Sequence, residues 1–201
     1  MNKGIPVIIS GPSGAGKTTL YRMAIQTIPA VKHSISYTTR PPRPGDIDGR
    51  DYHFVSGARF EEMARGGEFI EYAHIHGNRY GTARRDLEAL LREGSHVILE
   101  IDVQGAASLR KALDGAIYIF IAPPSIEACR RRLSTRGQDS SEVIERRLRA
   151  AAEEVRHAPL YDYIIINDQI KPSFERIKAI IAAEEIRTPR IADRIKKLFS
   201  L

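Results

Sequence analysis

The sequence predicts an α/β fold with a parallel sheet at its core, and three observations support this fold class. Short apolar runs alternate with segments of helical periodicity, which is the pattern of strands joined by helical crossovers. A glycine-rich turn at residues 11–16 directly follows the first apolar run. The alternation is interrupted between residues 36 and 82, which indicates an inserted subdomain.

Four apolar runs, each bounded by Gly, Pro, Asp or Asn, are predicted to be buried parallel strands. They cover residues 5–10, 96–101, 117–122 and 163–166. Helical spacing is found in residues 18–28, 83–92, 125–135 and 142–157. This order of strands and helices favours a sheet with right-handed crossovers.

The interruption opens with a turn-rich stretch at residues 40–46, RPPRPGD. Polar segments with aromatic residues follow at 51–55 and 69–76, and a short helix is indicated around residues 60–64. We expect small antiparallel strands around this helix. The length of 201 residues fits one domain with such an insertion.

The composition, 42% hydrophobic and 28% charged, is typical of a soluble globular protein and argues against disorder. A net charge of +6 favours anionic partners without choosing among nucleic acid, membrane surfaces and phosphorylated small molecules. The single cysteine, Cys129, excludes an internal disulfide and a cysteine zinc cluster, so we expect a reducing, cytoplasmic location. The apolar runs are far shorter than the roughly 18 residues of a membrane span, and we predict no signal peptide.

The sharpest motif is GPSGAGKT at residues 11–18, which matches the pattern G-x-x-x-x-G-K-[ST] between a predicted strand and a predicted helix. Glycines let backbone N–H groups close around phosphate oxygens, and the helix N-terminus adds positive potential. Lys17 can reach the outer phosphates, and Thr18 offers an oxygen to magnesium. The predicted ATP phosphate site consists of Gly11, Pro12, Ser13, Gly14, Ala15, Gly16, Lys17, Thr18 and Thr19.

An acidic residue at the end of another strand commonly helps to hold magnesium in such proteins. Glu100 and Asp102 close the run at residues 96–101, and Asp102 is nearer the carboxyl end, where open α/β sheets bind ligands. We therefore predict Thr18 and Asp102 as magnesium ligands, directly or through water. The alternative for Asp102 is an ordinary cap of the helix that starts near Val103.

The chain resembles the guanylate kinase family of nucleoside monophosphate kinases over nearly its whole length. The motifs that carry the resemblance are GPSG at 11–14, SYTTRPPR at 36–43, GRDY at 49–52, EFIE at 68–71, GNRYGT at 77–82, IDVQG at 101–105, IAPPS at 121–125, RLSTRG at 132–137, RRL at 146–148 and IND at 166–168. Several of these motifs are specific to that family and are not general to nucleotide-binding α/β folds.

The resemblance implies a P-loop NTPase-type sheet core, an inserted GMP-binding subdomain and a mobile lid. It also implies magnesium-dependent phosphoryl transfer from ATP to GMP. The expected division of the single domain 1–201 is a core of residues 1–35, 83–135 and 159–201, an insertion of residues 36–82 and a lid region of residues 136–158.

The acceptor site implied by the resemblance lies in the insertion. Arg40 and Arg43, three apart in a proline-stiffened loop, suit a single phosphate that they grip with charge-assisted bonds, and Tyr52 and Tyr80 can add hydroxyl donors. Ser36, Glu71 and Thr82 match residues that contact the guanine ring. Glu71 would accept from the ring N–H and exocyclic amine, a pair of donors that adenine lacks. The full GMP set is Ser36, Arg40, Arg43, Tyr52, Glu71, Tyr80, Thr82 and Asp102.

The resemblance also assigns residues to the lid and to adenine. Arg132, Arg136 and Arg147 match arginines that approach the phosphates, and with Lys17, Arg40 and Arg43 they form the predicted catalytic set. Asn167 and Asp168 match adenine contacts, and a strand-ending turn is the alternative for them.

Three other functions are possible alternatives. A kinase for another nucleoside monophosphate or a phosphorylated sugar is disfavoured by Glu71 together with Ser36 and Thr82. A guanylate-kinase-like module that only binds phosphopeptides is disfavoured by the complete Gly16-Lys17-Thr18 sequence. The hypothesis of a nucleic-acid-binding protein is supported by net charge alone, because the sequence has no base-stacking motif. ATP and GMP are therefore the predicted partners, without nucleic acid or membrane.

Overall fold

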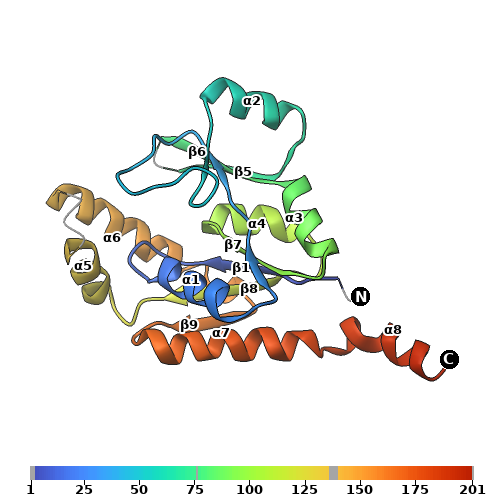
Figure 1. Cartoon of the computed structure of the whole chain (residues 1–201). Helices are drawn as coiled ribbons and strands as arrows, with labels where there is room; N and C mark the ends of the chain where they lie inside the picture. Colours follow the sequence, from blue (N-terminus) through green and yellow to red (C-terminus); the bar gives the residue numbers. More distant parts are fainter. Residues whose placement is uncertain (1–2, 76, 136–139, 201) are drawn as a thin grey trace.

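The structure, a computed structural model that describes residues 3–75, 77–135 and 140–200, confirms the predicted α/β fold. The core sheet has the strand order β2-β7-β1-β8-β9, and all neighbouring strands are parallel (Figure 1). The strands are β1 Pro6–Ser10, β2 Val31–His33, β7 His96–Glu100, β8 Ile117–Ala122 and β9 Tyr163–Ile166. The four predicted runs all form strands. The apolar pattern missed β2 because its three residues, Val-Lys-His, make no apolar run.

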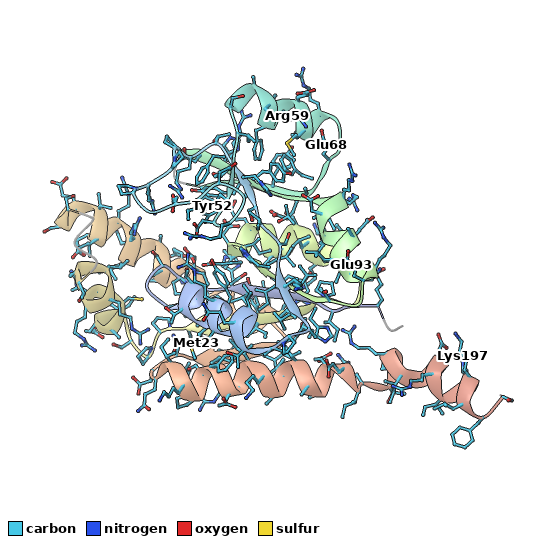
Figure 2. The ribbon with its side chains drawn as sticks, in the orientation of Figure 1. Met23, Tyr52, Arg59, Glu68, Glu93 and Lys197 are labelled. Atoms are coloured by element: carbon cyan, nitrogen blue, oxygen red, sulfur yellow. The ribbon has the colours of Figure 1, made fainter. Side chains whose placement is uncertain are left out.

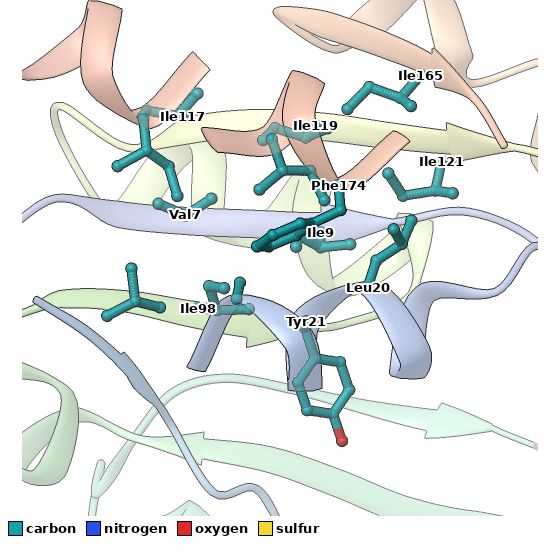
Figure 3. Packing of buried hydrophobic residues seen from close by; sticks show 14 of the residues in the cluster. Val7, Ile9, Leu20, Tyr21, Ile98, Ile117, Ile119, Ile121, Ile165 and Phe174 are labelled. Carbon is teal, nitrogen blue, oxygen red and sulfur yellow. The ribbon is translucent and has the colours of Figure 1, made fainter. Parts of the chain in front are cut away.

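Helices cover both faces of this sheet. Helices α1, Lys17–Thr27, and α7, Ile170–Glu185, pack on one face, while α3, Arg84–Arg92, and α4, Val103–Ala112, pack on the other. Figure 3 shows Phe174 of α7 over β1 beside Ile9, with Leu20 and Tyr21 of α1 in the same cluster. These layers leave the carboxyl ends of β1 and β7 open towards the insertion.

The insertion forms a lobe of its own with a second sheet in the order β4-β3-β6-β5 (Figure 1). Its elements are β3 Tyr37–Thr38, β4 His53–Phe54, α2 Gly57–Arg65, β5 Phe69–Ile75 and β6 Asn78–Ala83. Phe60, Met63 and Phe69 give the lobe a small core. The expectation of purely antiparallel strands is wrong for one pair, since β3 and β4 run parallel. The long loop between them, residues 39–52, returns the chain to the starting end of β3.

Two further helices, α5 Ile126–Thr135 and α6 Ser141–Val155, pack together beside the core through Cys129, Leu133, Ile144 and Leu148. The predicted lid region is thus helical from Ser141, and a 3-10 turn, η1, covers Ala158–Leu160. Residues 136–139, which include Arg136 and Gly137, lie outside the described residues.

The chain continues past α7 into α8, Thr188–Leu198, which lies beyond the body of the protein (Figure 1). No residue of α8 is buried. Arg190 near its start donates to the carbonyl of Gly115 at 2.6 Å, whereas Arg194, Lys196 and Lys197 are exposed. Within the ranges that the structure describes, none of the helices is long and apolar enough to cross a membrane.

Candidate active site

The glycine-rich loop between β1 and α1 is held in place by the end of β9. The Nδ2 of Asn167 donates to the carbonyl of Ala15 at 2.6 Å, and the Asn167 side chain is fully buried. Gly16 has φ +89°, and a Cβ at this position would collide with the Asn167 amide. The loop therefore requires glycine at this position, both for its backbone conformation and for this close packing.

Lys17 lies at the mouth of the loop. Its Nζ donates to the carbonyls of Gly11 at 2.6 Å and Pro12 at 3.2 Å, so the ammonium group lies across the loop opening. The loop and the N-terminus of α1 together form a site for an anion, since backbone N–H groups and a fixed cation converge there.

The carboxylate next to Thr18 is that of Glu100, at the end of β7. The Thr18 Oγ1 lies 3.4 Å from both Oε1 and Oε2 of Glu100. Asp102 instead caps α4, with its Oδ1 accepting from the N–H of Gly105 at 2.8 Å. Asp102 therefore acts as the helix cap that was the alternative for it, because β7 ends at Glu100 and α4 begins at Val103.

At the other end of the cleft, Glu71 of β5 pairs across the small sheet with Thr82 of β6. The hydroxyl of Thr82 donates to Glu71 Oε1 at 2.6 Å, and both side chains are buried. Burial raises the pKa of Glu71 to about 7, and the charge of Asp102 adds to the rise, whereas the bond from Thr82 opposes it. Two carboxyl groups, Glu71 and Asp102, thus lie together at this end.

Arg43, Tyr52 and Tyr80 form the wall between these two ends. The rings of Tyr52 and Tyr80 lie edge to face with centroids 5.8 Å apart. Arg40 is behind them, with its guanidinium 5.2 Å from the Tyr52 ring and hydrogen-bonded to Asp46 at 2.8 Å. Burial raises the pKa of Tyr52, so its hydroxyl remains a donor at neutral pH. Figure 2 shows Tyr52 on the side of the insertion that faces the core.

A single cleft between the insertion and the carboxyl ends of the core strands collects most of these groups. Its polar and charged lining consists of Ser13, Lys17, Ser36, Arg43, Tyr52, Glu71, Tyr80, Glu100, Asp102, Arg147 and Glu154. Lys17 lies at the phosphate-loop end, with Glu100 and Glu154 near the loop, Arg43 lies in the wall, and Glu71 and Asp102 lie at the other end. The cleft suits two anionic ligands, one of which presents hydrogen-bond donors to the buried Glu71 carboxyl group.

Comparisons with known proteins agree with this geometry. The model of the guanylate kinase family matches residues 3–184. The chain is 51% identical to the guanylate kinase of Geobacter sulfurreducens, over 99% of this chain and 98% of that protein. It is 48% identical to the guanylate kinase of Geobacter metallireducens, over the same shares of the two chains. The chain belongs to the guanylate kinase family.

The fold likeness extends to a solved member of the family. The crystal structure of guanylate kinase from Anaplasma phagocytophilum matches with a TM-score of 0.83 at 33% identity. The match covers 100% of this chain and 97% of that one. The insertion and the helices around the core sheet are therefore parts of a guanylate kinase fold.

Some site residues predicted from the family resemblance lie behind the cleft. Arg132 donates to the carbonyls of Gly14 and Asn167, at 3.3 Å and 2.8 Å, and so braces the phosphate loop from outside. Asn167 packs under that loop, and Asp168 and Thr19 are exposed beside it. Arg136 lies in the part of the chain that the structure does not describe. The roles of these residues towards ATP stay predictions.

Sequence reasoning missed Glu154 and preferred Asp102 to Glu100. Glu154 lines the cleft from α6 and lies near Lys17, whose charge lowers its pKa, while burial has the larger effect and raises it. A signal for Glu154 was present, because it follows Arg147 by seven residues and so shares its helix face. The sequence did not show that β7 ends at Glu100, which is the information needed to place this carboxylate beside Thr18.

Proposed function

We infer that this protein is an ATP:GMP phosphotransferase, which transfers the γ-phosphoryl group of ATP to GMP and yields ADP and GDP in purine nucleotide metabolism. One observation carries this inference. The buried Glu71 carboxyl lines the same cleft as the phosphate loop. A group that can bind guanine and a site for the ATP phosphates therefore share one cleft. A cytoplasmic location belongs to the same proposal.

The chemistry requires positioning and charge neutralisation more than a protein nucleophile, because the acceptor phosphate is itself the nucleophile. We assign the ATP phosphates to the loop of residues 11–18. We assign the GMP phosphate to Arg43, Tyr52 and Tyr80, with Arg40 as their support. Lys17 and Arg147 both line this cleft, and we assign to them the neutralisation of the negative charge that builds up during transfer.

The donors near Thr18 fit a magnesium ion that arrives with ATP. The Thr18 hydroxyl and the Glu100 carboxylate are hard oxygen donors on one side of the phosphate loop, and magnesium favours such oxygens. Bound there, the ion would supply charge neutralisation for the transferred phosphate. We therefore assign Glu100, in preference to Asp102, to magnesium or its waters, and Asp102 to the guanine end.

The lid assignment of residues 136–158 is also part of the proposal. Its support is α6, which brings Arg147 and Glu154 into the cleft from that region. Closure of this region over both substrates would exclude water, which otherwise competes with GMP for the phosphoryl group.

The decisive test is an ADP-release assay with ATP, magnesium and each of GMP, AMP, CMP and UMP. We expect turnover with GMP to exceed turnover with the other three by orders of magnitude, since a site built to bond a substrate N–H rejects analogues without it. Comparable turnover with AMP would exclude the guanine assignment. An absence of turnover with all four would exclude the enzyme function and favour a binding module.

A further inference from the structure

An ion pair joins α1 to the insertion at the back of the acceptor site. The Nη2 of Arg22 donates to Asp51 Oδ1 at 2.8 Å. Arg22 lies one helical turn after Thr18, on the helix that begins at the phosphate loop. Asp51 immediately precedes Tyr52 of the GMP phosphate wall. The pair therefore connects the element that holds ATP to the segment that holds the acceptor.

The segment on the insertion side, residues 40–52, is here called the acceptor loop. Asp46 Oδ2 accepts from the backbone N–H of Arg43 and from the Arg40 guanidinium, both at 2.8 Å. Asp51 Oδ2 accepts from the N–H of Ile47 at 2.9 Å and from Arg50. These bonds fix the shape of the acceptor loop from within. Its position relative to the core must come from contacts outside it.

Arg22 supplies such a contact, because its guanidinium pairs with a largely buried and ionised carboxylate. The Asp51 side chain is only 9% exposed, whereas that of Arg22 is 56% exposed. Burial disfavours the charge on Asp51, but hydrogen bonds from Ile47 and Arg50 and the charge of Arg22 hold its pKa below the usual value. The carboxylate therefore stays charged at neutral pH and available to Arg22.

The position of the acceptor loop matters for transfer. Arg43 and Tyr52 both belong to it, and both line the cleft. A shift of the loop by a fraction of an ångström would move the grip on the GMP phosphate away from the ATP phosphates, and transfer is sensitive to displacements of this size. Arg22 itself does not line the cleft. Besides Asp51 its side chain bonds Tyr21 on the same helix, so the contact that reaches the acceptor loop is the one with Asp51.

We propose that Arg22 is a positioning residue for the acceptor nucleotide: through Asp51 it holds the acceptor loop at the place relative to the phosphate loop that GMP binding requires. This inference rests on the proposed function. It adds a separate consequence: loss of Arg22 weakens GMP binding and leaves the ATP site intact.

The test is a kinetic comparison of the full-length protein with Arg22→Ala, Arg22→Lys and Gln26→Ala. We expect Arg22→Ala to raise KM for GMP by about three- to tenfold, the size expected of a partly exposed charge pair, and to leave KM for ATP within about twofold. Arg22→Lys should recover most of the loss, because the lysine ammonium can replace the charge. Gln26 is exposed on the same helix, one turn further on, and Gln26→Ala should match the parent.

A double-mutant cycle with Asp51→Asn completes the test. This substitution removes the charge of Asp51 but keeps an oxygen for the Ile47 N–H. If Arg22 acts through Asp51, Arg22→Ala should raise KM for GMP no further in the Asp51→Asn background. Additive effects, equal changes in the two KM values, or an unchanged KM for GMP in Arg22→Ala would each overturn the proposal. A parent protein inactive towards GMP would instead refute the proposed function, so the two failures are distinguishable.

Discussion

Glu71 and Thr82 face each other across the small sheet, and the Thr82 hydroxyl donates a 2.6 Å hydrogen bond to Glu71 Oε1. The bond occupies one carboxylate oxygen and fixes the carboxyl plane before any ligand arrives. The other oxygen, Oε2, lies towards Gly105 at the start of α4. The Glu71 carboxyl group, which we propose binds guanine, is therefore bonded by Thr82 on one side and close to Gly105 on the other, and each side can be altered separately.

Replacement of the Thr82 hydroxyl tests the first side. Thr82→Val keeps the shape of the buried residue but removes the donor. We expect KM for GMP to rise about fivefold, because loss of the hydrogen bond that orients the Glu71 carboxyl group costs about 1 kcal/mol. Thr82→Ser keeps the hydroxyl and serves as the matched control with a near-parental KM. Steady-state kinetics with GMP as the varied substrate measures both variants, and equal KM values for valine and serine would refute the orienting role.

Gly105→Ala tests the second side. A Cβ at Gly105 would lie 2.9 Å from Glu71 Oε2, so it must displace this buried carboxyl group, and it would press on Asp102 Oδ1 at 3.2 Å. We expect KM for GMP to rise at least about tenfold, by loss of a charge-assisted bond to the guanine donors. KM for ATP should be unchanged. The control is Gly57→Ala in α2, where an added Cβ meets no atom within 4 Å. If Gly105→Ala has the same GMP kinetics as the parent, GMP binding does not depend on the position of the Glu71 carboxyl group beside Gly105.

The pKa of Glu71 predicts a pH dependence of guanine binding. Burial raises this pKa to about 7, and only the ionised carboxylate accepts from both guanine donors. The ionised fraction therefore grows as pH rises through 7, and guanosine affinity should increase about tenfold between pH 6 and pH 8. Guanosine is the ligand to use in calorimetry, since the GMP phosphate itself titrates near pH 6.

The control for this pH dependence is Glu71→Gln, which cannot titrate at that position. Its guanosine affinity should be low and flat over the same pH range. The same pKa has the opposite effect on stability. The unfolded carboxyl ionises near 4.5 and the folded one near 7, so the contribution of Glu71 to the free energy of unfolding is complete below pH 4.5 and is lost as pH rises through 7. Guanosine affinity that does not change with pH in the parent would exclude Glu71 as the titrating group.

Local sequence patterns predicted the parts of this protein that local physics determines. The phosphate loop was found because glycine spacing and a strand-loop-helix context are both local. The choice between Glu100 and Asp102 as the magnesium carboxylate depends on where β7 ends, and in the structure β7 ends at Glu100 whereas Asp102 caps α4. The pairing of Arg22 with Asp51 joins residues 29 positions apart, on two different lobes. Such contacts follow from tertiary packing, which the sequence alone did not predict.

The last prediction concerns Lys17. Its Nζ is hydrogen-bonded to the carbonyls of Gly11 and Pro12, so a cation is fixed at the loop mouth before ATP binds. We expect Lys17→Ala to lower kcat at least ~10²-fold, since loss of a fixed charge at the transferred phosphate costs a few kcal/mol in the transition state. KM for GMP should change little, because the acceptor wall belongs to the insertion. Lys3→Ala removes an exposed lysine and is the charge-matched control. Circular dichroism and thermal unfolding establish that both variants are folded, and a folded Lys17→Ala protein with near-parental kcat would remove Lys17 from the transfer step.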